Sequence, residues 1–341
     1  MRFLKPAAAA LFLTALLAYP ETALNAAREA MYAWYKSVAP ALFPFMALTP
    51  LLTCPESVRA YERLLGRWMR PLLNLPGSAA PAVAIGMTAG SPTGAAAALR
   101  ACAAAGLSRA ELERIVCCVG GMSPAFLITG IGASMLGSPA DGYLLMRAQL
   151  ASQLALLIAT RRIAPDEPLP PPADSAADLP LRAAVSGALA VCGYMMLFSV
   201  AAALIARIAR SEWAGLAAVC LLELPSAARA VSALALRRET RLLMIAALAG
   251  LGGMCIAAQN LSACRRTVRP ARYLAARLAQ AALMTAFTAL QLRFPLHRQK
   301  NPLPVLEISA FIAAVFALIA LFSREKDQFL NKRNSGKNPG F

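Results

Sequence analysis

Long apolar segments recur along the whole chain, and this repetition constrains the fold more than any other feature of the sequence. The segments are 6–19, 38–53, 80–99, 115–136, 143–160, 183–208, 213–236, 242–261, 273–292 and 303–322. Charged residues make up only 15% of the chain, whereas soluble globular domains carry about 25%. An apolar solvent explains this deficit. We therefore expect an all-α polytopic membrane protein in contact with membrane lipids.

The charge and the cysteines exclude several other classes of protein. The net charge is +17, but Lys and Arg form short clusters between apolar segments, where they set orientation and meet headgroups rather than nucleic acid. The eight cysteines include no C-x-x-C pair, and His297 is the only histidine. We expect no metal site, no cofactor and no catalytic residues, and therefore no enzyme.

Short matches suggest that the chain contains two similar halves. Gly120–Met122 recurs at Gly252–Met254 after 132 residues, and the YLLMR motif at 143 recurs as YLAAR after 130 residues. Pro92 and Pro225 interrupt two apolar segments that lie 133 residues apart. Three matches in one order at nearly one shift predict an internal two-fold repeat.

The loop charges favour an inverted relation between these halves. If segments 80–99 and 213–236 are re-entrant, twenty Lys and Arg residues lie on the cytoplasmic side and ten on the opposite side. This bias agrees with the positive-inside rule. It predicts about eight transmembrane helices plus two broken or re-entrant segments, the architecture of many secondary transporters. The alternative, with fully crossing segments and parallel halves, stays open.

The expected organisation has six parts. They are an N-terminal transmembrane helix or signal anchor (1–30), a first repeat (31–162), a linker rich in proline and acidic residues (163–182), a second repeat (183–295), a C-terminal transmembrane helix (296–322) and a basic tail (323–341).

Polar groups at the interruptions are the candidate binding residues. Four-residue glycine spacing around Gly94 fits close helix packing, and equally a bent segment whose polar groups line a cavity. Glu223 is a functional candidate because an acid at membrane depth is costly, although an interfacial position would also explain it. We expect Arg147 and Arg277, near segment starts, to extend to the interface. The predicted substrate-binding residues are Ser91, Thr93, Gly94, Ser123, Glu223, Ser226, Gln259 and Asn260.

Five stretches resemble the YlbJ family of sporulation integral membrane proteins, which carries the nucleoside-recognition Gate domain. They are APALFPFMALTPLL at 39, AIGMTAGSPTGAAAALR at 84, GGMSPAFLITGIG at 120, LLELPSAARAVSAL at 221, and GLGGMCIAAQNLSA at 250 followed by RYLAARLAQA. The resemblance covers roughly residues 30–295. It implies a multi-pass protein of the mother-cell or forespore membrane that is needed for spore formation.

Two functions follow from these features. The first is a transporter or gated pore for a small polar solute, which the family label would make nucleoside-like. The second is a membrane scaffold that recruits spore-assembly proteins or forms homo-oligomers, using the basic tail and the basic helix at 59–73.

Overall fold

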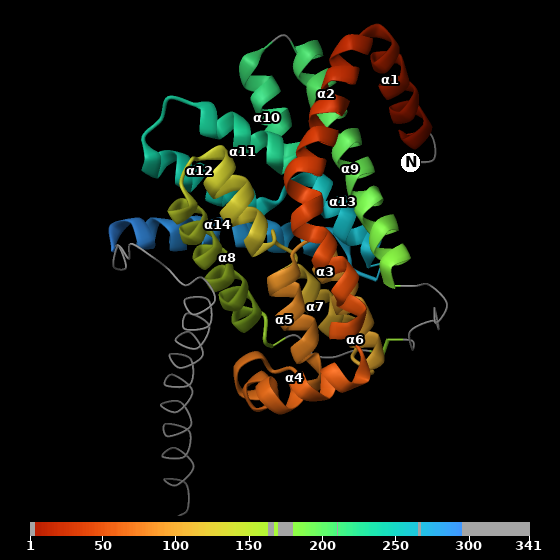
Figure 1. The fold of residues 1–341 in the computed structure, drawn as a ribbon, viewed down its shortest axis with the longest axis vertical. Helices are drawn as coiled ribbons and strands as arrows, with labels where there is room; N and C mark the ends of the chain where they lie inside the picture. The colour runs from red at the N-terminus through yellow and green to blue at the C-terminus, as the bar shows by residue number, and fades with distance from the viewer. Residues whose placement is uncertain (1–3, 163–166, 170–179, 210, 265–266, 295–341) are drawn as a thin grey trace, which may run out of the picture.

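The computed structural model describes residues 4–162, 167–169, 180–209, 211–264 and 267–294. Within these ranges the chain is almost entirely helical and has no β-strand, as an all-α membrane protein requires (Figure 1). The expected C-terminal helix (296–322), the tail (323–341) and most of the linker (163–182) lie outside the described residues.

The helices before the linker include several short and π-helical pieces. They are α1 (Leu4–Ala18), α2 (Pro20–Ala33), η1 (Trp34–Val38), α3 (Ala39–Leu52), α4 (Pro55–Trp68), η2 (Met69–Leu73), η3 (Gly77–Ala79), α5 (Ala80–Ala89), α6 (Thr93–Ala104), α7 (Arg109–Val119), η4 (Phe126–Met135) and α8 (Pro139–Ala159). Those after it are α9 (Pro180–Ala209), α10 (Glu212–Leu222), α11 (Leu224–Ala233), α12 (Arg238–Leu251), α13 (Gly253–Ala263) and α14 (Pro270–Arg293).

Four helical runs are long and apolar enough to cross a membrane: α8, α9, α12 with α13, and α14. They coincide with the predicted segments 143–160, 183–208, 242–261 and 273–292. Large apolar side chains also face outward, including Leu17 (83% exposed) and Trp213 (82% exposed). Exposure of this kind is expected where lipid is the solvent, so the chain is a multi-pass membrane protein.

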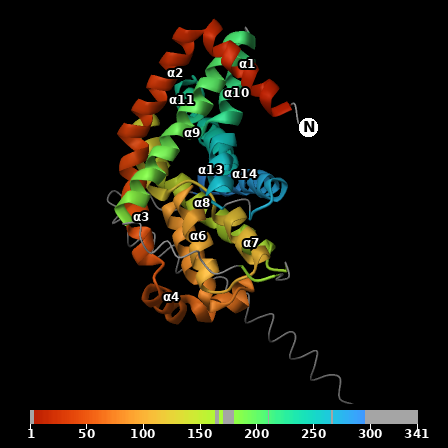
Figure 2. The ribbon, with the colours of Figure 1, turned by 90° about the vertical axis from the view of Figure 1, so that its right-hand side faces the viewer.

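The remaining predicted spans have a different form in the structure. The segment at 38–53 forms the end of a longer helical run from Pro20 to Leu52. This run is bent by 101° from α1 and lies beside α9 (Figure 2). The segment at 115–136 is divided into α7 and η4. Counting each bent pair as one span gives up to six spans in the described residues. The number eight therefore stays a prediction.

The order of broken and continuous helices is the same in both halves. A broken pair (α5 and α6), an interrupted run (α7 and η4) and the continuous α8 come first. A broken pair (α10 and α11), an interrupted run (α12 and α13) and the continuous α14 follow after the linker. This succession agrees with the predicted duplication, whereas the inversion stays a prediction.

A buried arginine shows that α5 and α6 begin and end near each other. Arg114, which follows this pair in the chain, donates from Nη2 to the carbonyl oxygen of Leu73, which precedes it, and to that of Leu157 (2.7 Å). Both ends of the broken pair therefore lie at one end of the bundle, which favours a segment that turns back.

Two sets of ion pairs join the halves at different places. Glu113 Oε2 lies 2.8 Å from Arg269 Nη2 and 2.8 Å from Arg272 Nη1, and Asp141 pairs with Arg238. The two members of an ion pair lie at the same side of the membrane. An even number of membrane crossings must therefore separate them along the chain. If α7 with η4, α8, α9 and α12 with α13 each cross once, α10 and α11 together must turn back. The ion pairs thus favour a re-entrant segment at α10 and α11, as the contacts of Arg114 do for α5 and α6.

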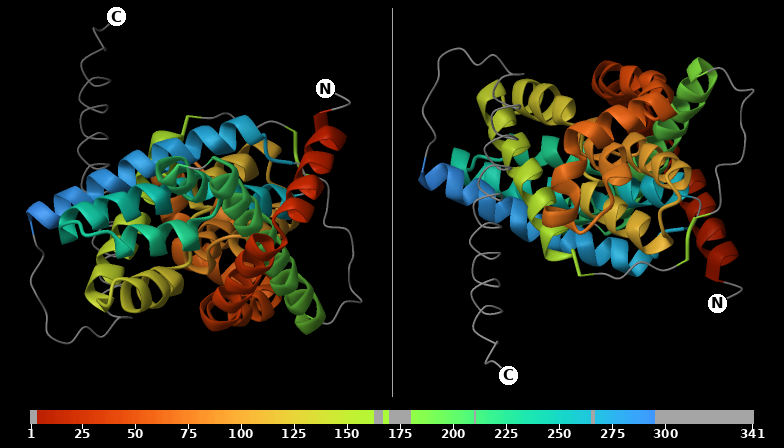
Figure 3. Two further views of the ribbon diagram at one scale, coloured as in Figure 1. Left: turned by 90° about the horizontal axis from the view of Figure 1, so that it is seen from above. Right: turned by 90° about the horizontal axis from the view of Figure 1, so that it is seen from below.

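Two hydrophobic clusters fill the interior on either side of the interruption after α7. The first is built mainly by α5, α6, α7 and the C-terminal part of α8. The second is built by η4, the N-terminal part of α8, α11 and α12. Val119 belongs to the first cluster and Met122 to the second. The helix α14 runs along one side of the bundle (Figure 3) and contributes to both clusters.

Candidate functional site

The first two interruptions of the chain are packed against each other. Gly90 has a φ of +69°, and a Cβ at this position would lie 2.3 Å from the backbone nitrogen of Ser123. The backbone nitrogen of Ser91 donates to the carbonyl oxygen of Gly121 (2.9 Å). Only glycine combines this φ with such a close approach. The sequence therefore brings the ends of α5 and α7 into direct backbone contact.

Side chains from the second half bind the carbonyl oxygen of Gly120. Asn260 Nδ2 donates to it (3.3 Å), as does Arg277 Nη1 (3.1 Å), and Tyr273 Oη lies 3.4 Å away. Ser91 Oγ lies 2.9 Å from the same oxygen. All four side chains are buried. Because a helix end leaves carbonyl groups without partners, these donors are what allows α7 to end inside the protein.

Arg277 corrects the expectation that this arginine extends to the membrane interface. Its side chain is 1% exposed, and Nη2 donates to the carbonyl oxygen of Cys117. The guanidinium therefore lies at the C-terminus of α7, where the helix dipole favours a cation. The sequence did not predict this role, because Arg277 lies near the start of an apolar segment, where arginines commonly extend to the interface.

Amide side chains of α8 hold the unwound residues after Gly120. Gln149 accepts a hydrogen bond from Met122 N at Oε1 (3.2 Å) and donates from Nε2 to Met122 O (2.6 Å). Gln153 donates to the carbonyl oxygen of Val119 (3.2 Å). Both glutamines are buried. They replace the hydrogen bonds that a continuous helix would make within itself. The sequence did not predict this role of the two glutamines.

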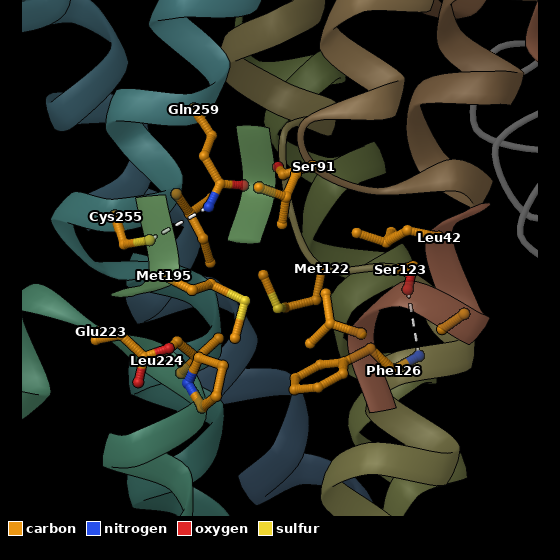
Figure 4. A pocket seen from close by; sticks show the side chains of 15 residues that line it. Leu42, Ser91, Met122, Ser123, Phe126, Met195, Glu223, Leu224, Cys255 and Gln259 are labelled. Atoms are coloured by element: carbon orange, nitrogen blue, oxygen red, sulfur yellow. Dashed lines mark hydrogen bonds between the residues drawn. The ribbon is translucent and has the colours of Figure 1, made fainter. Parts of the chain in front are cut away.

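A cavity of about 40 Å³ lies where these interruptions meet (Figure 4). We call it the central cavity. Its wall is lined by Val38, Ala41, Leu42, Ser91, Met122, Ser123, Phe126, Val191, Met195, Glu223, Leu224, Pro225, Cys255, Ile256 and Gln259. Apolar side chains form most of the wall, and a few polar groups interrupt it. This composition is typical of binding sites for small molecules.

Glu223 is the only carboxylate among these lining residues. It stands at the break between α10 and α11 and is 2% exposed. Its Oε2 accepts a hydrogen bond from Ser226 N (2.7 Å) and caps α11, whereas Oε1 has no hydrogen-bond partner among the described residues. A buried polar atom without a partner is uncommon in native proteins and marks a place where a ligand or water would bind.

A second cavity of about 220 Å³, which we call the side cavity, adjoins the central one. Gln259 and Val191 line both cavities. Thr93, whose buried Oγ1 has no partner in the described part of the chain, lines the side cavity, as does Arg100. In Figure 4, the amide of Gln259 lies between Cys255 and Ser91 at one edge of the central cavity. Gln259 thus stands between the two spaces.

The structure places only some of the predicted residues on a cavity wall. Ser91, Ser123, Glu223 and Gln259 line the central cavity, and Thr93 lines the side cavity. Gly94 packs instead against Gly86, since a Cβ at position 94 would lie 2.9 Å from the Gly86 Cα. Asn260 binds Ser91 and Gly120 within the protein, and Ser226 contributes its backbone nitrogen to the cap of α11.

Several residues of the wall could not be predicted from the sequence. Met122, Met195 and Cys255 face the cavity (Figure 4), but apolar side chains in apolar segments carry no signal that separates a cavity wall from a packed core. Tyr273 and Arg277 did carry a signal, because both occur in the motif that recurs between the halves.

A curated relative supports the resemblance noted in the sequence. The chain is 31% identical over 152 residues to the sporulation integral membrane protein YlbJ of Bacillus subtilis. The match covers 44% of this chain and 37% of the relative. No family model matches the chain, and no solved structure matches it. The match confirms the resemblance to YlbJ.

Proposed function

We propose that this chain, a relative of the sporulation protein YlbJ, is a membrane protein of a sporulating cell that transports a small polar solute through its central cavity. By resemblance it would act in the mother-cell or forespore membrane. The observation that carries the proposal is the meeting of interrupted helices at a cavity lined by Glu223, whose Oε1 has no hydrogen-bond partner among the described residues. Interrupted helices leave polar backbone groups at membrane depth, where transporters bind their solutes.

In this conformation the central cavity is too small for a drug-sized solute. A space of about 40 Å³ admits water-sized groups, because one water needs roughly 10–15 Å³. Pockets for drug-sized ligands have volumes of about 300–1,000 Å³. A nucleoside-like solute would therefore require the central and side cavities to join, which displacement of the Gln259 side chain would achieve.

Transport is tested by reconstituting the purified protein in liposomes and measuring uptake of nucleosides, amino acids and sugars. We expect at least one solute to enter faster than in protein-free liposomes. Glu223→Gln should slow this uptake by about tenfold or more, because hydrogen bonds to charged groups contribute about 1.5–3 kcal/mol. Glu212→Gln, at the exposed start of α10, is the matched control. Absence of uptake for every solute under every gradient would contradict the proposal.

A scaffold for spore-assembly proteins is the second candidate. The helix α4 carries the exposed Arg59, which pairs with Glu56 (3.1 Å), and Arg67, which lies over the Trp68 ring. Such a basic helix suits anionic headgroups or acidic partners. If the scaffold hypothesis is correct, deleting residues 323–341 should abolish spore formation, whereas Glu223→Gln should have no effect on it.

A further inference from the structure

We propose that Glu223 is a proton-binding site and that its protonation is coupled to solute movement through the central cavity. The coupling rests on the proposed transport function, whereas the proton site rests on the geometry of Glu223 alone. Protonation adds a hydrogen to a carboxylate oxygen, and deprotonation returns that hydrogen to water in the cavity.

The two oxygens of this carboxyl group have different surroundings. Oε2 is held by Ser226 N at the start of α11 (2.7 Å). Oε1 is buried and has no hydrogen-bond partner among the described residues. A proton on Oε1 would leave the cap of α11 intact and create an O–H donor at the cavity wall. The neutral and ionised forms can therefore occupy the same fold.

Apart from the N-terminus of α11, which Glu223 caps, little positive charge near this residue compensates its ionised form. On the cavity wall, α13 contributes Cys255 and Gln259, whereas η1, α3 and α9 contribute only apolar residues, and η4 contains no titratable residue. Arg229 is on the same helix as Glu223, but it is exposed. On α12, Arg241 donates to Ser232 O at the other end of α11 (3.2 Å). An ionised carboxylate with little compensation favours uptake of a positive charge.

The chemistry of the wall points to a proton rather than a metal ion. Hard cations such as Ca²⁺ and Mg²⁺ take about six or more oxygen ligands. Apart from Glu223, the side-chain oxygens of the wall are those of Ser91, Ser123 and Gln259, and the rest is hydrocarbon, the sulfurs of Met122 and Met195, and the thiol of Cys255. These are fewer than six oxygens in all. A proton needs only the carboxylate and a water molecule. The central cavity has room for such water.

The side cavity supplies a route to the carboxyl group. It adjoins the central cavity at Gln259 and extends to Arg100. Gln259 Nε2 donates to the Cys255 sulfur (3.2 Å), which is a weak acceptor. Such a bond is easily exchanged for one to water. The Gln259 amide is thus placed to admit water from the side cavity towards Glu223.

Infrared difference spectroscopy on the purified protein in vesicles tests the proton site without any solute. A protonated-carboxyl band should change in intensity between about pH 5 and pH 9, a range accessible to a buried glutamate. We expect this band in the unmodified protein and in Glu212→Gln, and we expect Glu223→Gln to lack it. The amide oxygen that this substitution introduces can still accept the bond from Ser226 N, so the fold should persist, which thermal unfolding verifies. Absence of the band, or its persistence in Glu223→Gln, would overturn the proton site.

Coupling is tested in liposomes that contain a pH-sensitive dye. A transported solute should cause a change of internal pH in the unmodified protein, and Glu223→Gln should abolish this change. If the infrared band is present but no solute moves, the transport function fails and the proton site stands. If solute moves without a change of pH, transport stands and the coupling is wrong.

Discussion

At the scale of single residues, Gly90 is the position where an added methyl group should lower the stability of the fold most. Its φ of +69° is unfavourable for other residues, and a Cβ would lie 2.3 Å from Ser123 N. We expect Gly90→Ala to destabilise the protein by about 2–5 kcal/mol, from backbone strain and overpacking together. Thermal unfolding in detergent measures the effect.

Gly193 on α9 is the control for that substitution, because no described atom lies within 4 Å of its added Cβ. Alanine there should stabilise the helix by about 0.5–1 kcal/mol. Equal melting temperatures for the two variants would contradict the close packing of the interruptions.

Asn260 tests the hydrogen bonds around the end of α7. Its Nδ2 lies 2.8 Å from Ser91 Oγ and 2.6 Å from Tyr273 Oη, in addition to the bond to Gly120 O. Asn260→Leu keeps the branched shape of the side chain, with bulkier methyl groups, and removes the donor, so we expect a loss of at least about 1–3 kcal/mol. Ser262→Ala, at an exposed position of the same helix, should change the melting temperature little. A neutral Asn260→Leu would show that the network contributes nothing to stability.

At the scale of helices, the contact between α7 and the start of α14 should make stability depend on pH. Burial alone would raise the pKa of Glu113, but hydrogen bonds from Arg269 and Arg272 outweigh it and hold this pKa below its ordinary value of 4.5. A lowered pKa means that the ion pairs stabilise the fold above pH 4.5. This stabilisation is lost as the pH falls through the pKa of the folded state.

The expected result is a gap in melting temperature between the unmodified protein and Glu113→Gln at pH 7, which shrinks below about pH 4.5. Glu239→Gln, an exposed acid on α12, should show no such gap. A gap that is constant with pH would mean that Glu113 acts through packing rather than charge.

The helices differ in how well the sequence predicts them. Uninterrupted apolar runs predict α8, α9 and α14 to within four residues at each end, because length and hydropathy decide such helices. The segment at 115–136 has similar hydropathy, yet it divides after Val119. The division depends on Gln149 and Asn260, which satisfy the freed backbone groups from distant positions. Local pattern carries no information about such long-range partners, and for the same reason Arg277 was placed at the interface.

At the scale of the whole molecule, the direction of the two broken pairs determines the topology. The contacts of Arg114, Glu113 and Asp141 favour pairs that turn back. Single cysteines at Ala104 and Glu239, both exposed, should then be labelled from opposite sides of the membrane on a cysteine-depleted background. An impermeant maleimide applied to intact and opened vesicles measures this. Labelling from the same side would mean parallel halves.

The donors on the Gly120 carbonyl also bear on how the protein is made. The end of α7 is synthesised well before Asn260 and Arg277, which later cover it. In the interval its free carbonyl groups have no partner from the second half, and hydrocarbon supplies none. Ser91 can already bind the Gly120 oxygen (2.9 Å), but water or headgroups must take the places of Asn260 and Arg277 until α13 and α14 are made. Completion of the N-terminal half is therefore a late event of biosynthesis, and a chain truncated within the linker would be a substrate for membrane quality control.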